Sequence, residues 1–300
     1  MMSKKMHMNS KGLLAVVLAG MTWFVPMPVA AQQAFPTADA AAAALVDAIA
    51  RKDEAAKRLV LGNDWRKFIP TENIKDKDVD AFLEGWAASH KIVVDPAHTA
   101  HLAVGTQEWV LPIPIVEKKG TWRFDTRAAV EEIRTRRIGR NELATMQAAL
   151  AYYDAQKEYA LEDRNGDGVL EYAQKTISTP GQQDGLYWAA LEGEAESPLG
   201  PLFGEAGPSS EGYYGYRYRI LTAQGDKAPG GAYDYLIQNR LVAGFALVAW
   251  PVKYGDSGVM SFMVSHDGVL YEKNLGPKSD EIARAMTRFN PDSSWRKVIP

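Results

Sequence analysis

A glycine-poor segment that runs into an acidic loop constrains the fold of this chain more than any other feature. Residues 126–162 contain one glycine, Gly139, so we predict two helices here, or one helix bent around Ile138–Arg140. The second part of the segment carries an apolar stripe with the spacing of one helix face. The stripe consists of Leu143, Met146, Leu150 and Tyr153. We expect this stripe to pack against a core.

The loop after this helical segment has the pattern of a calcium-binding loop. Oxygen-bearing side chains alternate along it, and Gly168 stands where such a loop turns sharply. The predicted ligands are Asp163, Asn165, Asp167, the carbonyl of Val169, and Glu171. A complete EF-hand loop ends on a bidentate glutamate, whereas residues 163–174 end on Gln174. A turn that caps the helix through side-chain to backbone hydrogen bonds explains the same residues, and both interpretations stay open.

The N-terminus has the three parts of an export signal. Lysines precede an apolar run that begins at Gly12, and Val29–Ala31 supplies the small residues of a cleavage site. We therefore expect residues 1–31 to be a signal peptide cleaved after Ala31, and the protein to be periplasmic or secreted. The chain has no cysteine, so disulfides cannot contribute to its stability.

Composition narrows the classes of partner. The net charge is −3, and removal of the signal's lysines would make it more negative, which disfavours nucleic acid. After the signal, no segment has the roughly 18 uninterrupted apolar residues of a membrane span, so we expect no transmembrane segment in the mature chain. Hydrophobic residues make up 46% of the sequence, which is enough for one large or two ordinary cores.

Residues 36–125, the N-terminal module, have an α+β pattern. We predict helices over Thr37–Val60 and Asp76–His90, followed by a meander of short antiparallel strands. The predicted strands cover residues 91–95, 98–105, 107–116 and 121–125. This element order and the ending PIPIVEKKGTWRFD resemble nuclear-transport-factor-2-like domains. The resemblance implies a curved sheet that wraps a helix.

Residues 126–300, the C-terminal module, add an antiparallel sheet to the long helical segment. The predicted strands cover residues 213–221, 243–252, 259–266 and 269–275. His266-Asp267-Gly268 is typical of a hairpin turn, and a closing helix over Ser279–Phe289 is expected to use Ser279 as its cap. Helix, acidic loop and final hairpin resemble the heads of type II secretion pseudopilins and type IV pilins. The N-terminal apolar run lacks the acidic residue of pilins, so the resemblance implies a module that does not polymerise by the pilin route.

Almost the whole mature chain resembles one exported bacterial family, known as domain-of-unknown-function family 2950. The matching stretches include WVLPIPIVEKKGTWRFDT, YDAQKEYALEDRNGDGVLEYAQ, STPGQQDGLYW, GYYGYRYRILTAQG and GFALVAWPVKYGDSGVMSF. This resemblance implies export and the fold of a shared family. It implies no particular activity.

Tyr214, Tyr216 and Tyr218 alternate with other residues and predict three phenols on one side of a strand. Such a row is suited to binding a partner protein of the envelope, and packing against a neighbouring helix is the other interpretation. The arginines of residues 134–140 are interpreted as a solvated helix face, because Glu132 and Arg136 are spaced for an ion pair.

No set of residues predicts a catalytic site. TAH at Thr99–His101 and GDSG at Gly255–Gly258 have the order of serine-protease motifs, but a long helical region separates them. We therefore expect a non-enzymatic binding or assembly protein of the bacterial envelope. The alternative is a small-molecule binder or hydrolase with a pocket in the N-terminal module, lined by Trp86, Trp109 and Trp122.

Overall fold

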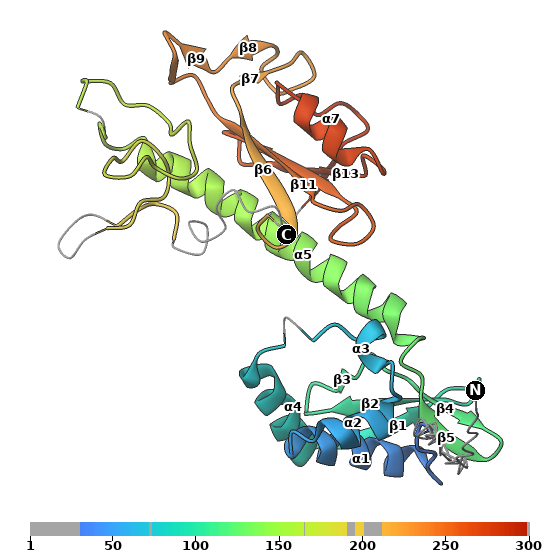
Figure 1. Cartoon of the computed structure of the whole chain (residues 1–300). Coiled ribbons are helices and arrows are strands. Elements are labelled where there is room, and N and C mark those ends of the chain that lie inside the picture. The colour runs from blue at the N-terminus through green and yellow to red at the C-terminus, as the bar shows by residue number, and fades with distance from the viewer. Residues whose placement is uncertain (1–30, 72–73, 165, 191–195, 201–211, 299–300) are drawn as a thin grey trace, which may run out of the picture.

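The computed structural model describes residues 31–71, 74–164, 166–190, 196–200 and 212–298. Residues 1–30 of the predicted signal peptide and the predicted ligand Asn165 lie outside these ranges. The fold is α+β, with helices and antiparallel sheets. One long helix, α5 (Ala129–Tyr159), runs between an N-terminal and a C-terminal body (Figure 1).

In the N-terminal module, four helices precede an antiparallel sheet. The helices are α1 (Ala38–Ala50), α2 (Glu54–Leu61), α3 (Trp65–Phe68) and α4 (Asp76–Ala88). The strands are β1 (His90–Val94), β2 (Thr99–Val104), β3 (Trp109–Val110), β4 (Ile115–Lys118) and β5 (Thr121–Phe124), in the order β1-β2-β4-β5 with β3 beside β2. The prediction of a single helix over Thr37–Val60 is wrong, because Lys52 takes a φ of 51° and Asp53 caps a new helix.

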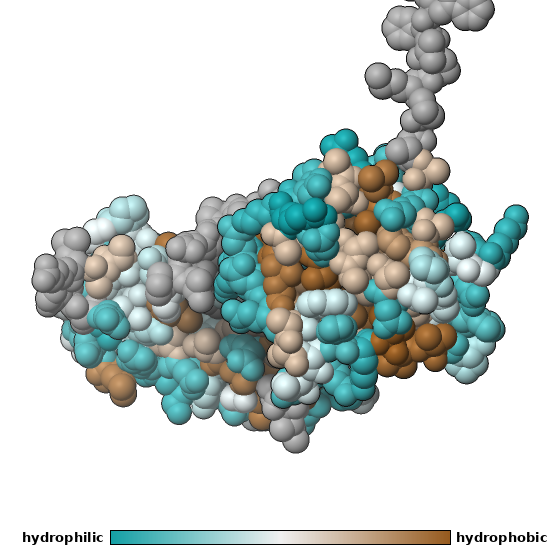
Figure 2. Space-filling model, turned by 90° about the horizontal axis from the view of Figure 1, so that it is seen from below, coloured by the Kyte–Doolittle hydropathy of each residue, from teal (hydrophilic) through white to brown (hydrophobic). Residues whose placement is uncertain are grey.

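The core of this module lies between its helices and the sheet. Leu45 of α1, Leu102 of β2 and Ile115 of β4 are fully or almost fully buried there. Ala129, the first residue of α5, is buried in the same core. The N-terminal module therefore holds the start of α5. Figure 2 views the molecule from below Figure 1, where the N-terminal module lies, and shows apolar areas between polar ones on this surface.

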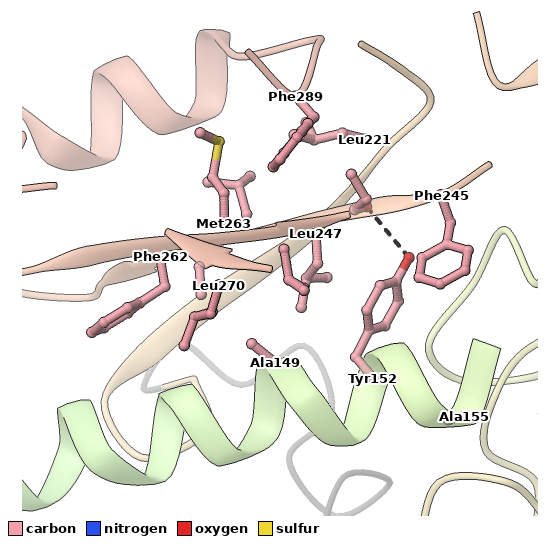
Figure 3. Close-up of a cluster of buried hydrophobic side chains, with 14 of the residues drawn as sticks. Ala149, Tyr152, Ala155, Leu221, Phe245, Leu247, Phe262, Met263, Leu270 and Phe289 are labelled. Carbon is pink, nitrogen blue, oxygen red and sulfur yellow. Dashed lines mark hydrogen bonds between the residues drawn. The ribbon is translucent and has the colours of Figure 1, made fainter. Parts of the chain in front are cut away.

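The C-terminal module contains a five-stranded antiparallel sheet between two helices. Its strand order is β14-β13-β12-β11-β6, with α5 on one face and α7 (Ser279–Ala285) on the other (Figures 1 and 3). The strands are β6 (Tyr216–Leu221), β11 (Ala246–Pro251), β12 (Ser261–Ser265), β13 (Leu270–Lys273) and β14 (Arg296–Val298). Short pairs add β7 (Ala223–Gln224), β8 (Tyr233–Asp234), β9 (Leu236–Ile237) and β10 (Arg240–Leu241). The predicted hairpin at residues 266–268 is confirmed, and Gly268 has the φ of 72° that the turn needs.

Helix α5 is continuous, and its buried face differs in part from the predicted one, since Met146 and Tyr153 pack against the core as expected but only partly buried. Nothing lies within 4 Å of the position where a Cβ on Gly139 would stand, so this glycine costs helix stability without bending the helix. Leu143 of the predicted stripe exposes 60% of its surface. The buried residues instead recur from Asn141 to Tyr159: Asn141, Thr145, Ala148, Ala149, Tyr152, Ala155, Gln156 and Tyr159. Small side chains let α5 approach the sheet closely, and Tyr152 reaches the carbonyl of Ala246 on β11 (Figure 3).

The closing helix also begins differently from the prediction. Lys278 is the residue that precedes α7, and Ser279 lies inside the helix with 1% of its surface exposed. Ser279 is therefore not the cap. Asp280 and Glu281 stand in the first turn as expected, where carboxylates are favoured by the helix dipole.

Candidate functional site

The acidic loop begins just after α5 ends, and Asp163 organises it. The carboxylate of Asp163 accepts backbone hydrogen bonds from Gly166 at 2.9 Å, Asp167 at 3.2 Å and Gly168 at 2.7 Å. Gly166 and Gly168 have φ values of 70° and 85°, which glycine adopts without strain. These contacts are those of the capping turn.

Asp167 is held by an arginine from a distant strand. Arg240 of β10 donates to its Oδ2 at 2.7 Å, and Oδ1 accepts the N–H of Val169 at 3.0 Å. Gln174 reaches the same region, because its side chain donates to the carbonyl of Asn239 at 2.9 Å. The middle and the end of the loop are thus fastened to β10 and to the turn before it.

Glu171 lies close enough to the other carboxylates to feel their charge. Burial raises the pKa of Glu171, the negative charges of Asp167 and Asp163 raise it further, and Arg240 opposes them. Across the described parts of the chain, no three His, Cys, Asp or Glu side chains are arranged as a metal site. Of the five predicted ligand positions, Asp163 and Asp167 affect the charge of Glu171, but the three side chains do not converge as a metal site.

Sequence reasoning missed Arg164, which fixes the loop to the end of α5. Its side chain is 7% exposed and pairs with Glu162 at 3.0 Å. The guanidinium stands 5.8 Å from the ring centre of Tyr159 and 5.3 Å from that of Trp188, a cation–π arrangement. Burial, with the nearby charges of Glu171 and other acids, raises the pKa of Tyr159 to about 12. An arginine between Asp163 and Asn165 in a polar loop gives no sequence signal of burial.

The predicted row of tyrosines is not a row. Strand β6 begins at Tyr216, and Tyr214 lies in the turn before it with a φ of 49°. Tyr216 is fully buried and donates to the carbonyl of Met260 at 2.8 Å, while Tyr218 donates to Thr145 of α5 at 3.3 Å. Burial raises the pKa of both phenols. Tyr214, which exposes 47% of its surface, is the one of the three that can meet a partner through most of its ring.

The three tryptophans of the alternative site stand in different surroundings. Trp86 stacks on His90 with ring centres 3.7 Å apart. The backbone of Trp122 forms an antiparallel bridge with Phe35, and its side chain packs against the core. Trp109 exposes 47% of its surface and lies 5.9 Å from the guanidinium carbon of Arg136. In the C-terminal module, a hollow of about 250 Å³ is lined by Thr222, Ala223, Asp234, Leu236, Thr287 and Arg288. That volume is small for an organic ligand.

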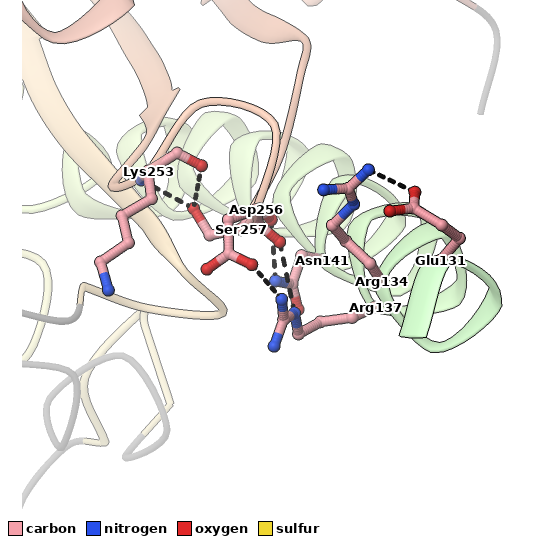
Figure 4. Close-up of polar contacts among 7 residues, drawn as sticks. All are labelled: Glu131, Arg134, Arg137, Asn141, Lys253, Asp256 and Ser257. Carbon is pink, nitrogen blue, oxygen red and sulfur yellow. Dashed lines mark hydrogen bonds and ion pairs between the residues drawn. The ribbon is translucent and has the colours of Figure 1, made fainter. Parts of the chain in front are cut away.

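Two neighbouring arginines of α5 join the modules, which corrects the interpretation of a solvated face. Arg136 makes the predicted ion pair with Glu132 at 2.7 Å and also donates to the carbonyl of Val110 on β3 at 2.6 Å. Arg137 pairs with Asp256 in the turn between β11 and β12 (Figure 4). Adjacent positions of one helix thus contact both modules.

The serine of the GDSG motif belongs to that same turn. The hydroxyl of Ser257 bonds the backbone of Lys253, and its carbonyl accepts from Asn141 of α5 at 2.8 Å (Figure 4). His101 is in β2 of the other module, where it faces Asp95 at 3.8 Å. The structure therefore does not bring these two residues together, and the motif serves the contact between α5 and the sheet.

The chain belongs to the family of proteins of unknown function DUF2950, whose profile matches residues 32–298. The chain has no match among curated proteins or among solved structures. None of the helices in the described ranges combines the length and apolar character that membrane crossing requires.

Proposed function

We propose that this protein is an exported, non-enzymatic binding or assembly protein of the bacterial envelope, and that its loop at residues 163–174 binds calcium. The calcium proposal is supported by the order of oxygen-bearing residues in the loop and by the charges around Glu171, whose pKa is raised first by burial and then by the negative charges of Asp167 and Asp163. Carboxylates that repel one another at the end of a helix are stabilised when a divalent cation joins them.

The proposed ligand set follows from the spacing of oxygen-bearing residues in the loop. Calcium takes six to eight oxygen ligands at about 2.3–2.6 Å. Asp163, Asp167 and Glu171 supply charged oxygens, and Asn165 and the carbonyl of Val169 complete the set proposed here. Asp167 must then share its oxygen or give up its bond to Arg240. Calcium binding therefore loosens or moves the link between the loop and β10.

The proposal extends to the two modules. Helices packed on an antiparallel sheet support a nuclear-transport-factor-2-like N-terminal module, and α5 lying along the larger sheet supports a pilin-like C-terminal module. The apolar run after the first lysines supports a signal peptide and a periplasmic or secreted location. The exposed ring of Tyr214 supports a partner contact close to the end of β6.

Calorimetric titration with calcium, paired with thermal unfolding, tests the loop. A ligand that binds the native state alone stabilises it by about 2.7 kcal/mol at 100 times its Kd. Glu171→Gln keeps the shape of the side chain and removes its charge, so it should lose most of the heat of binding and most of the rise in Tm. Asp163→Ala would also break the turn, which makes it the weaker test.

The matched control is Glu158→Gln, which removes a charge from the exposed surface of α5 outside the loop. It should bind calcium like the wild type. Equal binding by Glu171→Gln and the wild type, or no binding by the wild type, would refute the calcium site. Pull-down from a periplasmic extract with calcium or with chelator tests the binding role, which fails if no partner is recovered under either condition.

A further inference from the structure

Strand β1 presents a free and exposed sheet edge. It ends the strand order of the N-terminal sheet, and four of its five residues are exposed. Val93 and Val94 expose 48% and 51% of their surfaces. The open N–H and C=O groups of such an edge are available to pair with another strand. We propose that β1 pairs with β1 of a second copy of this chain, antiparallel, about a two-fold axis at Val93.

The hydrogen bonds of β1 set which residues can make this pair. In the β1–β2 ladder Val93 faces His101, and Asp95 donates to Thr99 at 2.8 Å. Antiparallel strands exchange bonds at alternate residues, so the backbone groups of Val93 and Asp95 point to β2. Those of Ile92 and Val94 point to the open edge. An axis at Val93 places Ile92 of each copy opposite Val94 of the other. The outward backbone groups of these residues then meet in two pairs, one on each side of the axis.

Charge selects this register over its neighbours. With the axis at Val93, Lys91 of each copy stands opposite Asp95 of the other. These side chains lie on the same sheet face as Val93 of both copies. A shift by two residues places Lys91 or Asp95 opposite Val93, and a shift by one turns the outward backbone groups away from each other. With the axis at Val93, the central pair is apolar, and a pair of opposite charges flanks it on each side.

Contacts inside one copy leave these charges able to take part. Lys91 bonds Glu108 at 2.6 Å, but both side chains are more than half exposed, and such pairs hold side chains weakly. Asp95 uses Oδ1 to accept from Ala97 and Thr99. Its Oδ2 lies 3.8 Å from Nε2 of His101, a contact long enough to yield to a lysine of the second copy. Pro96 limits the pair to a short segment because it has no N–H to donate. A short interface of this kind gives a weak dimer that depends on protein concentration.

Single cysteines test the axis directly, because the chain has none of its own. In an antiparallel ladder, residues opposite each other without hydrogen bonds have Cα atoms about 4.5 Å apart, which suits a disulfide. Val93→Cys should cross-link at least roughly tenfold faster than Ile74→Cys under mild oxidation, because pairing raises the effective thiol concentration. Ile74 is the matched control, with 52% of its surface exposed outside the strand. Equal rates would overturn the proposal.

Sedimentation of the unmodified protein over a range of concentrations gives a second readout. The wild type should shift toward dimer as concentration rises. Val93→Asp brings two carboxylates together at the axis and should stay monomeric, whereas Ile74→Asp should behave like the wild type, with circular dichroism confirming that both are folded. A wild type that is monomeric throughout would overturn the proposal, including the case in which this edge takes a strand from a different protein.

Discussion

The core of the N-terminal module consists of alanine, aliphatic and a few aromatic side chains, whereas the core beneath α5 contains tyrosines and glutamines bonded to buried backbone groups. Among the described residues, all the buried polar side chains lie at Thr126 or beyond. An apolar core is specified mainly by volume, while a polar network is specified by its partners. The C-terminal module should therefore be the less tolerant of substitutions that keep size and remove hydrogen bonds.

The largest effect is expected from Gln156→Leu. Gln156 donates to the hydroxyl of Tyr152 at 2.9 Å and to the carbonyl of Ala173 at 2.8 Å, and it accepts the N–H of Ala173 at 2.8 Å. Leucine removes the partner of the buried N–H and of the buried carbonyl of Ala173, at about 1–3 kcal/mol each, and one of the two bonds of the Tyr152 hydroxyl. Urea unfolding should show a loss of about 3–5 kcal/mol. Gln147→Leu, on the exposed side of the same helix, should stay within about 0.5 kcal/mol of the wild type.

The corresponding change in the N-terminal core is expected to cost much less. Leu45 is 1% exposed and makes no side-chain hydrogen bond. Leu45→Met keeps its volume, so the free energy of unfolding should fall by less than about 1.5 kcal/mol. If this variant loses as much stability as Gln156→Leu in the same urea experiment, the proposed contrast between the cores is wrong.

The junction between the modules should contribute a smaller amount. Arg137→Gln removes the ion pair with Asp256, in which the arginine side chain is 33% exposed and the aspartate side chain 49%. We therefore expect the free energy of unfolding to fall by about 1 kcal/mol. Arg134→Gln removes a pair with Glu131 within one helix turn, and a change of about 0.3 kcal/mol is expected. Thermal unfolding compares the two. A larger effect from Arg134→Gln would contradict a junction role for Arg137.

The last prediction concerns pH, and it tests the ion pairs of one carboxylate in α7 rather than a core. Burial pushes the pKa of Asp280 up, but hydrogen bonds from Trp250, Arg284 and Arg217 outweigh it and lower the pKa from 3.8 to about 2. The stability that ionised Asp280 provides is present above its unfolded pKa and is lost as the pH falls through its folded pKa. The advantage of the wild type over Asp280→Asn should therefore shrink between about pH 4 and pH 2. Unfolding curves at several pH values would reveal a constant difference if the assignment is wrong.

Local patterns predicted much of this fold. Alternation and turn residues located most of the longer strands, and the Asp267-Gly268 hairpin followed from the need for positive φ. The predicted strand at residues 107–116 is wrong, because the chain there forms the short β3 and then the start of β4, and β7–β10 and β14 were not predicted. The face of α5 did not follow, because hydrophobicity favoured Leu143 while close packing selected Ala148 and Ala149. A glycine-poor segment indicated a helix, but the sequence did not show which side the sheet would cover.

The candidate sites were less predictable because they depend on distant contacts. Asp163 was named from its loop, and its hydrogen bonds fit both the turn and a cation site. Arg240 pairs with Asp167 from a segment more than 70 residues away, which no local motif indicates. Tyr214 was assigned to a strand by alternation, but the turn before β6 removes it from that strand. Charge and spacing identify side chains better than they identify partners.

Helix α5 begins in one core and ends in another, and this imposes an order on synthesis. The N-terminal core is complete once the first turns of α5 have been made. The strands that cover the C-terminal half of α5 come from residues 216–298. This half of the helix therefore emerges from the ribosome long before the sheet that covers it. Until then, Tyr152 and the alanines around it face water. A chain halted before β6 would present this bare surface to its neighbours, and aggregation of nascent chains would start there.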